Sequence, residues 1–238
     1  MGDHPADHPG PLVFVADLAG PVLAPEDAHH LGRVLRMRPG DPLTVGDGAG
    51  AFRTAVLGAD ASVEPTGEVR TAPRPAPEIT VGFALVKGDK PELVVQKLTE
   101  LGVDRIVPFR ADRSVVRWDE AKAAKAVERL RAVAASAAAQ CHRPHLPQVA
   151  DVTSLDALLD PGAQMGPVAV ADRTGAPPSL SWPAILVGPE GGWSDRERAL
   201  PVARVALGGH VLRAETAAVT AGALLAALRA GLVAERSG

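Results

Sequence analysis

A β-strand that runs into a glycine-rich turn and then into a helix is the feature that most constrains the fold of this chain. Residues 185–187 are three β-favouring apolar residues, and residues 188–193 hold three glycines and one proline. Ser194 follows at an N-cap position, with Glu197 three residues later, which is the spacing of a capping box. In α/β folds such a bare loop at a helix N-terminus binds ligands, because no Cβ keeps a ligand from the main chain. A plain strand-to-helix turn is the alternative for a single loop of this kind.

A second glycine turn follows about one helix later. Residues 207–212 contain Gly208 and Gly209, and Arg213 and Glu215 stand where this turn gives way to another helix. Two such turns on neighbouring strands can clasp one ligand between them. The pair is neither a Walker loop, because no Lys-Ser or Lys-Thr follows the glycines, nor a GxGxxG dinucleotide fingerprint.

The N-terminal third of the chain is predicted to be rich in strands. Residues 25–37 predict its one helix, because Pro25 and two acidic residues open it and Pro39-Gly40 end it. The proline-rich stretch 71–77 predicts a stiff linker, so we expect one domain at 1–73 and a second at 74–238. Strands are expected at residues 12–15, 43–45, 51–57 and 62–69.

The rest of the chain alternates strands and helices. A strand at 79–86, a helix at 91–101 ended by Gly102, and a strand at 103–109 predict a βαβ unit and hence a parallel sheet. The last helix, at 216–233, is rich in Ala and Leu, so its apolar surface needs a partner, either its own domain or a second chain. Further helices are expected at 119–139 and 154–159, and a further strand at 168–171.

The charge pattern excludes a general polycation but leaves local basic regions. The net charge is −3, and residues 1–73 hold five Arg against ten Asp or Glu. Within that part only Arg33 and Arg36, three apart on one helical face with Arg38 nearby, can form a phosphate-contacting spot, and a solvated helix face is the alternative. Residues 105–131 are locally basic, with eight Lys or Arg against four acids.

Cysteine usage and hydropathy indicate a cytoplasmic protein. The single Cys141 excludes an internal disulfide and suits a reducing cytosol. No run reaches the roughly 18 apolar residues of a membrane span, and residues 1–11 lack an apolar signal core. No metal site is expected, because Cys141, His142 and His145 have no second ligand pair to complete a set of four.

The two glycine turns resemble the cofactor loops of the SPOUT (trefoil-knot) methyltransferases. Residues 30–41, residues 87–103 and Asp112-Arg113-Ser114 resemble, in the same order, one family within them, the 16S rRNA uracil-N3 methyltransferases. Gln140, Cys141 and Arg143 also match that family, whereas Ala139 replaces its usual Glu. The resemblance covers nearly the whole chain. It implies an α/β fold with a knotted parallel sheet flanked by helices, preceded by a small PUA-like RNA-binding barrel, and a homodimer joined through the C-terminal domain.

The resemblance also implies a reaction, the methylation of N3 of one uridine in 16S rRNA of the small ribosomal subunit, with S-adenosylmethionine as the methyl donor. Arg213 lies one residue past the second turn, where its guanidinium can stabilise the uracil anion, and Glu190 can accept the proton or hold a donor. A salt bridge from Arg213 to Glu215 or Glu190 that only pins the turns is the alternative. Cofactor binding is expected at Val187, Gly188, Gly191, Gly192, Leu207, Gly208 and Leu212, and RNA binding at Arg33, Arg36, Arg113, Gln140 and Arg143.

Two other functions fit the residues alone. An RNA-binding or ribosome-assembly factor could keep the same fold without turnover, and a nucleotide-binding regulator could use the same loops. Binding of the methyl donor separates the enzyme from the regulator, and methyl transfer to RNA separates it from the assembly factor.

Overall fold

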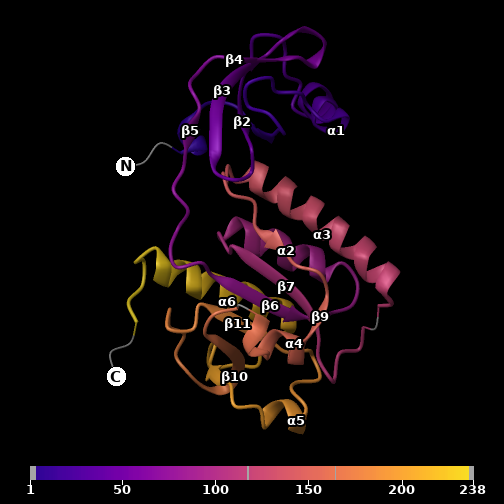
Figure 1. Cartoon of the computed structure of the whole chain (residues 1–238), viewed down its shortest axis with the longest axis vertical. Coiled ribbons are helices and arrows are strands. Elements are labelled where there is room, and N and C mark those ends of the chain that lie inside the picture. The colour runs from indigo at the N-terminus through magenta and orange to yellow at the C-terminus, as the bar shows by residue number, and fades with distance from the viewer. Residues whose placement is uncertain (1–3, 117, 164, 236–238) are drawn as a thin grey trace. The chain divides into compact units, whose positions relative to one another are not determined.

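The computed structural model describes residues 4–116, 118–163 and 165–235. The chain divides into two compact units, and each is built on its own β-sheet (Figure 1). One unit comprises Met1–Arg74 and Ala135–Leu146, and the other comprises Pro75–Ala134 and Pro147–Gly238.

Residues 135–146 join the first unit, although the sequence prediction placed them in the C-terminal domain. The Leu146 N–H donates to the Gly48 carbonyl at 2.8 Å. The buried His145 ring lies 3.1 Å from the Ala72 carbonyl and against Gly50, where any Cβ would collide with the ring. These contacts link residues 73 to 98 positions apart in the chain, so no local sequence pattern predicts them.

The sheet of the first unit has the order β1-β2-β3-β4, with β5 beside β3. Strands β1 and β2 are parallel and the other pairs are antiparallel. Alternate residues such as Leu43, Val45 and Ala55 point into a small apolar core that also contains Leu31. The strands are β1 (Leu12–Phe14), β2 (Pro42–Gly46), β3 (Ala51–Leu57), β4 (Val63–Pro65) and β5 (Arg70–Thr71), and the short helices are η1 (Pro5–Asp7), α1 (Pro25–His29), η2 (His30–Val34) and η3 (Ala59–Ala61).

The helix predicted at 25–37 ends earlier than expected. It runs through α1 and the π-helical turn η2, and then the Met37 N–H donates back to the Leu31 carbonyl at 3.0 Å, a Schellman-type ending. Arg36 takes the left-handed position of that ending, with φ 56°, where glycine is usual. The prediction that Arg33 and Arg36 share one helical face is therefore wrong, because Arg36 lies beyond the helix.

The second unit is an α/β domain built on a parallel sheet, as predicted. The sheet has the order β12-β10-β11-β6-β7-β8, with β9 also paired to β7, and every pair is parallel. Its strands are β6 (Thr80–Ala84), β7 (Arg105–Arg110), β8 (Gln148–Val149), β9 (Thr153–Ser154), β10 (Val168–Ala176), β11 (Ala184–Val187) and β12 (Ala203–Val205). Its helices are α2 (Lys90–Glu100), α3 (Glu120–Gln140), α4 (Leu155–Leu159), η4 (Pro161–Ala163), α5 (Asp195–Arg198) and α6 (Ala214–Arg229), with the last turns of α3 in the first unit.

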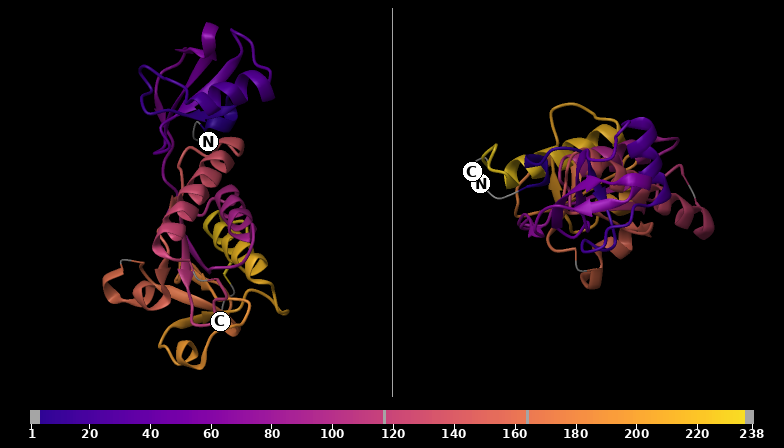
Figure 2. Two further views of the ribbon diagram at one scale, coloured as in Figure 1. Left: turned by 90° about the vertical axis from the view of Figure 1, so that its right-hand side faces the viewer. Right: turned by 90° about the horizontal axis from the view of Figure 1, so that it is seen from above.

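Both faces of this sheet are covered, so its strands are apolar on both sides. Val81 and Phe83 of β6 belong to a core with α2, α3 and α6, while Ala84 belongs to a second core with α4 on the opposite face. Figure 2 shows α2 and α6 side by side, and a Cβ on Gly222 would lie 2.5 Å from Leu98 at their contact. Helices therefore cover both faces of the predicted parallel sheet, and α2 and α6 approach so closely at Gly222 that a larger residue would not fit there.

The last helix, α6, is anchored at its C-terminal end by a buried ion pair. The Arg229 guanidinium donates to Asp104, whose side chain is only 2% exposed, and to the Gly102 carbonyl at 2.7 Å. Asp104 also accepts the Ile79 N–H at 3.0 Å, so neither charge is left without a partner. Within the ranges that the structure describes, no helix is both long and apolar enough to cross a membrane.

Candidate functional site

The first glycine turn begins where β11 ends and leads directly into α5. Ser194 is the N-cap residue: its hydroxyl accepts the Glu197 N–H at 3.1 Å, and the Glu197 carboxylate accepts the Ser194 N–H at 2.8 Å. The predicted capping box is confirmed. Because Glu197 is buried, this box fixes the exit of the turn firmly.

Two glycines of this turn are required for different reasons. A Cβ on Gly188 would lie 2.9 Å from the Trp193 ring. That ring is held by its indole N–H, which donates to the Ala171 carbonyl at 2.9 Å, and by stacking on Phe109. Gly192 has φ +67°, a conformation that favours glycine, although an added Cβ there would make only an ordinary contact with the Arg198 side chain, at 3.8 Å. A side chain at either position thus disturbs the turn itself before it meets any ligand.

The loop after β7 braces this turn from outside. Hydrogen bonds from the Arg196 guanidinium, at 2.8 Å, and from the Ser194 hydroxyl, at 2.6 Å, hold the pKa of Asp112 at about 2. The Arg113 guanidinium donates to the Gly191 carbonyl at 3.3 Å. The Asp-Arg-Ser stretch found in the sequence therefore supports the turn, in addition to the RNA contact predicted for Arg113.

The second glycine turn connects β12 to α6. None of the backbone N–H groups of residues 207–212 donates a hydrogen bond to any part of the chain that the structure describes. Exposed peptide groups of this kind are available to a ligand. Arg213 is the N-cap residue of α6, and its carbonyl accepts the Ala217 N–H at 2.8 Å.

A cleft of about 710 Å³ opens between the two turns and the end of β10. Its volume lies in the range of small-molecule and cofactor sites. Arg213 and Glu190, the predicted catalytic pair, both line it. The cofactor-binding predictions on its wall are Val187, Gly188, Gly192, Leu207, Gly208 and Leu212, whereas Gly191 is not among its lining residues.

One wall of the cleft was not predicted from the sequence. The strand was expected to end at residue 171, but β10 continues to Ala176 and brings Asp172 and Thr174 to the cleft. The backbone N–H and hydroxyl of Thr174 donate to Asp172 at 2.9 and 2.8 Å and lower the pKa of that carboxyl. Three polar residues and a glycine, at 172–175, interrupt the apolar pattern, so the sequence gave no sign that the strand continues. Arg198 and His210 also line the cleft unpredicted.

A lysine that the sequence analysis did not single out joins the two turns. Lys90, at the start of α2, lies 2.7 Å from Glu190 and 3.3 Å from Glu215. Its hydrogen bond to Glu190, followed by that to Glu215, raises the pKa of the Lys90 ammonium. Among the described residues, neither Glu190 nor Glu215 pairs with Arg213. The salt bridge considered as the alternative role of Arg213 is instead made by Lys90. The Arg213 side chain is exposed and faces the cleft without an ion-pair partner in that part of the chain.

The residues predicted to contact RNA fall into two groups. Arg33, Arg36, Gln140 and Arg143 belong to the first unit, and Arg113 belongs to the second. The structure thus places Gln140 and Arg143 in the same unit as the two N-terminal arginines, which the sequence prediction did not expect.

Comparison with known proteins agrees with this architecture. The family model of an RNA methyltransferase domain matches residues 73–226, and that of an RNA methyltransferase PUA domain matches residues 23–61. Ribosomal RNA small subunit methyltransferase E of Bacillus subtilis is 32% identical over 221 aligned residues, which cover 81% of this chain and 84% of that protein.

Two solved structures share the fold over most of their length. Ribosomal RNA small subunit methyltransferase E of Neisseria gonorrhoeae, bound to S-adenosyl methionine, superposes with a TM-score of 0.79 and 30% identity over 92% of this chain and 97% of that one. A putative methyltransferase of Legionella pneumophila, in complex with the same cofactor, has a TM-score of 0.80 and 31% identity over 91% and 96%.

The sheet, the cleft and the matched models define the class: an RNA methyltransferase with a PUA domain. Within that class, the chain belongs to the ribosomal RNA small subunit methyltransferase E family.

Proposed function

We propose that the protein methylates small-subunit ribosomal RNA and uses S-adenosylmethionine as the methyl donor. The observation that supports this most directly is the cleft between the two glycine turns, where free peptide N–H groups and charged side chains converge. Two relatives of the same fold bind that cofactor.

The cleft fits the cofactor by shape and by chemistry. Backbone groups of residues 207–212 are available to hold its adenosine part, and the carboxylates of Asp172 and Glu190 can face its cationic groups. When bound, the cofactor supplies an electrophilic methyl group, so no metal is required for the transfer. The residues of the chain then have to hold the acceptor in line with the donor, which contributes much of the rate.

Arg213 is proposed as the main catalytic side chain. Uracil N3 carries a proton at neutral pH, and the anion formed when it leaves needs a positive partner at O2 or O4. A guanidinium remains protonated at all accessible pH values, so it can stabilise this anion but cannot act as the base. The Arg213 side chain is exposed at the cleft and has no competing ion pair among the described residues.

Glu190 is proposed to support the acceptor, with Lys90 as its positioning residue. The Lys90 ammonium lies 2.7 Å from the Glu190 carboxylate and fixes its place in the cleft. An ionised carboxylate in this position can accept the N3 proton or hold a hydrogen-bond donor.

The acceptor proposed here, N3 of one uridine in 16S rRNA, rests on the family resemblance. RNA would be held by Arg33, Arg36, Gln140 and Arg143 of the first unit and by Arg113 of the second. A ribosomal substrate also fits a cytoplasmic enzyme.

A homodimer joined through the C-terminal domain is part of the same proposal. One side of α6 is buried in its own unit by Ala218, Ala221 and Leu225, while Leu224 and Leu228 on another side are only half-buried. That remaining apolar side would be covered by a second copy. A monomer found by light scattering at micromolar concentration would rule out the proposed homodimer.

The experiment that tests the function combines two measurements. Calorimetry with S-adenosylmethionine measures cofactor binding, and mass spectrometry of rRNA nucleosides from cells with and without the gene identifies the methylated base. Cofactor binding without any change in the rRNA nucleosides would favour the assembly factor over the enzyme.

A further inference from the structure

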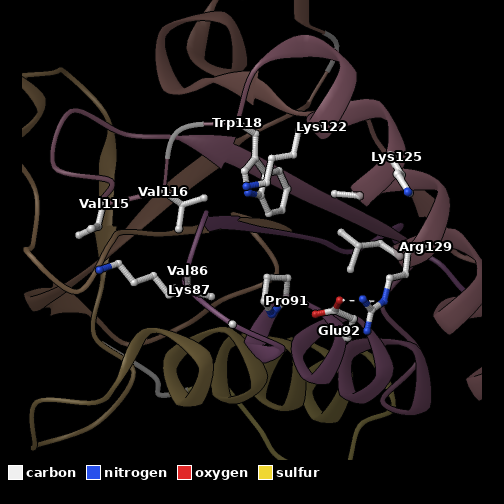
Figure 3. Close-up of a pocket in the computed structure, with 13 residues that line it drawn as sticks. Val86, Lys87, Pro91, Glu92, Val115, Val116, Trp118, Lys122, Lys125 and Arg129 are labelled. Carbon is white, nitrogen blue, oxygen red and sulfur yellow. Dashed lines mark ion pairs between the residues drawn. The ribbon is translucent and has the colours of Figure 1, made fainter.

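A second pocket lies in the same unit as the cleft, and the proposed reaction does not use it. We call it the Trp118 pocket (Figure 3); it has a volume of about 550 Å³. Its walls come from the loop after β6 with the start of α2, from the segment before α3, and from α3 itself. They include Lys87, Glu92, Trp118, Lys122, Lys125 and Arg129.

The rim of the Trp118 pocket is cationic. Lys122, Lys125 and Arg129 follow one another at the three- and four-residue spacing that places them along one face of α3. Arg129 pairs with Glu92 at 3.1 Å, which neutralises the one carboxylate of the lining. Lys87, Lys122 and Lys125 make no ion pair within the described residues, so their charges remain available to an anion.

Trp118 differs from the other two tryptophans of the chain. Trp193 is buried and stacked on Phe109, and Trp182 packs against the core of the second unit. Trp118 is only partly buried and is in none of the apolar cores, and its ring lies toward the pocket in Figure 3. Burial of the protein core therefore does not account for a large aromatic ring at this position.

The pocket adjoins the cofactor cleft through one short loop. Lys87, on the pocket wall, lies three residues before Lys90, whose ammonium is 2.7 Å from Glu190 of the cleft. A strand of RNA that presents one nucleotide to the cleft can thus reach the pocket with a neighbouring nucleotide.

We propose that the Trp118 pocket binds an unpaired RNA nucleotide next to the methylated one, with the base stacked on Trp118 and its phosphates held by Lys122 and Lys125. This inference rests on the proposed function and adds a subsite to it. An aromatic platform beside unpaired cations is how proteins hold single-stranded nucleic acid without reading its sequence. The Lys side chains fix the backbone, and stacking holds the base. An acidic peptide would satisfy the cations but would leave the indole ring, which lies toward the pocket, without a stacking partner.

The test uses the full-length protein and a ten-nucleotide single-stranded RNA of mixed sequence. Three variants are compared with the wild type: Trp118→Ala, Trp118→Phe and the double change Lys122→Ala/Lys125→Ala. Lys97→Ala serves as the matched control, because Lys97 is a partly exposed lysine of α2 that pairs with Glu100 outside the pocket. S-adenosylmethionine affinity is measured for each variant and reports whether the second unit is folded.

Trp118→Ala is expected to weaken RNA binding roughly 5- to 150-fold, the range for loss of one stacked base, while cofactor affinity stays unchanged. Trp118→Phe keeps an aromatic face and should recover most of the affinity. The double lysine variant should lower the salt slope by about 1.4, at about 0.7 per lost phosphate contact on a single strand, whereas Lys97→Ala leaves it unchanged.

Wild-type RNA affinity in both Trp118→Ala and the double lysine variant would overturn the proposal, as would failure of the wild type to bind the oligonucleotide. A poly-glutamate peptide that competes for Trp118 more strongly than the RNA does would assign the pocket to a protein partner instead. The subsite and the enzymatic function can be rejected separately. If the wild type methylates rRNA and the variants bind RNA with wild-type affinity, only the subsite is rejected. If the variants lose RNA affinity as expected but the wild type transfers no methyl group, only the enzymatic function is rejected.

Discussion

The cofactor cleft and the Trp118 pocket lie in one unit but are built from different parts of the chain. The cleft is shaped by two glycine turns whose main chain forms much of the wall, and Arg213 stands at its mouth without an ion pair among the described residues. The pocket is shaped by long side chains on a helix and a loop, with three lysines that can substitute for one another. An added Cβ at Gly188 in the wall of the cleft would collide with the Trp193 ring, whereas loss of one lysine from the rim of the pocket should lower affinity only in a small step. The two regions should therefore respond to substitution in different ways.

The largest effect is expected for Arg213, because our proposal places its guanidinium, rather than that of Arg173 or Arg198 on the same wall, at the reacting base. Arg213→Ala should slow the single-turnover methyl transfer by about 10²–10³, the usual loss for one oriented charge, with cofactor affinity nearly unchanged. Arg213→Lys keeps the charge but loses the planar fork, so it should recover only part of the rate. A rate for Arg213→Lys within twofold of the wild type would show that the planar fork is not needed and would count against the catalytic role.

The next effect tests the main-chain wall directly. Gly188→Val should weaken S-adenosylmethionine binding by about 100-fold, because the new side chain would displace the Trp193 ring from a packed site. Gly32→Ala in the first unit is the control, since no atom lies within 4 Å of a Cβ there and Gly32 does not line the cleft. Calorimetric affinities that are equal for the two variants would contradict a cleft formed by close main-chain packing.

A smaller effect is expected for Lys90, which positions carboxylates but touches neither cofactor nor base in our proposal. Lys90→Met should lower the methylation rate up to about fivefold, as expected for loss of an exposed ion pair. Glu190 raises the Lys90 pKa, so the ion pair is complete below the ordinary pKa of lysine and is lost only as the pH rises through the higher, folded value. The ratio of the wild-type methylation rate to that of Lys90→Met should thus stay constant from pH 7 to 9. A ratio that changes in this interval would mean that Lys90 itself exchanges a proton during the reaction.

The smallest effect is expected for Asp112, which accepts hydrogen bonds from Arg196 and Ser194 beside the first turn. The pKa of Asp112 is held at about 2, so its contribution to stability is present above the ordinary value of 3.8 and is lost as the pH falls toward 2. Asp112→Asn should lower the melting temperature slightly at pH 7, and the difference should vanish near pH 2. Thermal scans at several pH values measure this, and a difference that persists at pH 2 would place the cause elsewhere than in the charge.

Features with a local signal could be predicted from the sequence. The capping box of Ser194 and Glu197 lies within four residues, and Gly102 and the apolar spacing of α2 mark that helix clearly. The parallel sheet followed from the βαβ spacing, because a crossover helix leaves the chain little choice. The strand predicted at 51–57 is β3, with the same bounds.

Features that depend on distant contacts could not be predicted. Lys90 meets Glu190 across 100 residues, and nothing in the run around Lys90 distinguishes it from any lysine at a helix start. The Arg36 backbone takes a left-handed conformation that a sequence argument assigns to glycine, because the Leu31 anchor sets where the helix ends. His145 and Gly50 fit together only after two segments far apart in the chain have come together.

The anchored helix α6 has a consequence for anyone who screens variants of this enzyme by activity. Its 16 residues span about 24 Å, with Arg229 tied to Asp104 at one end and Arg213 preceding the first residue at the other. A helix is stiff along its axis, so a change in how its far end is seated moves the near end as well. Substitutions at Arg229 or Asp104 will be scored as active-site hits although neither residue reaches the substrate. In a map of mutational effects, the functional region of this enzyme will therefore appear longer than its cleft by the length of one helix.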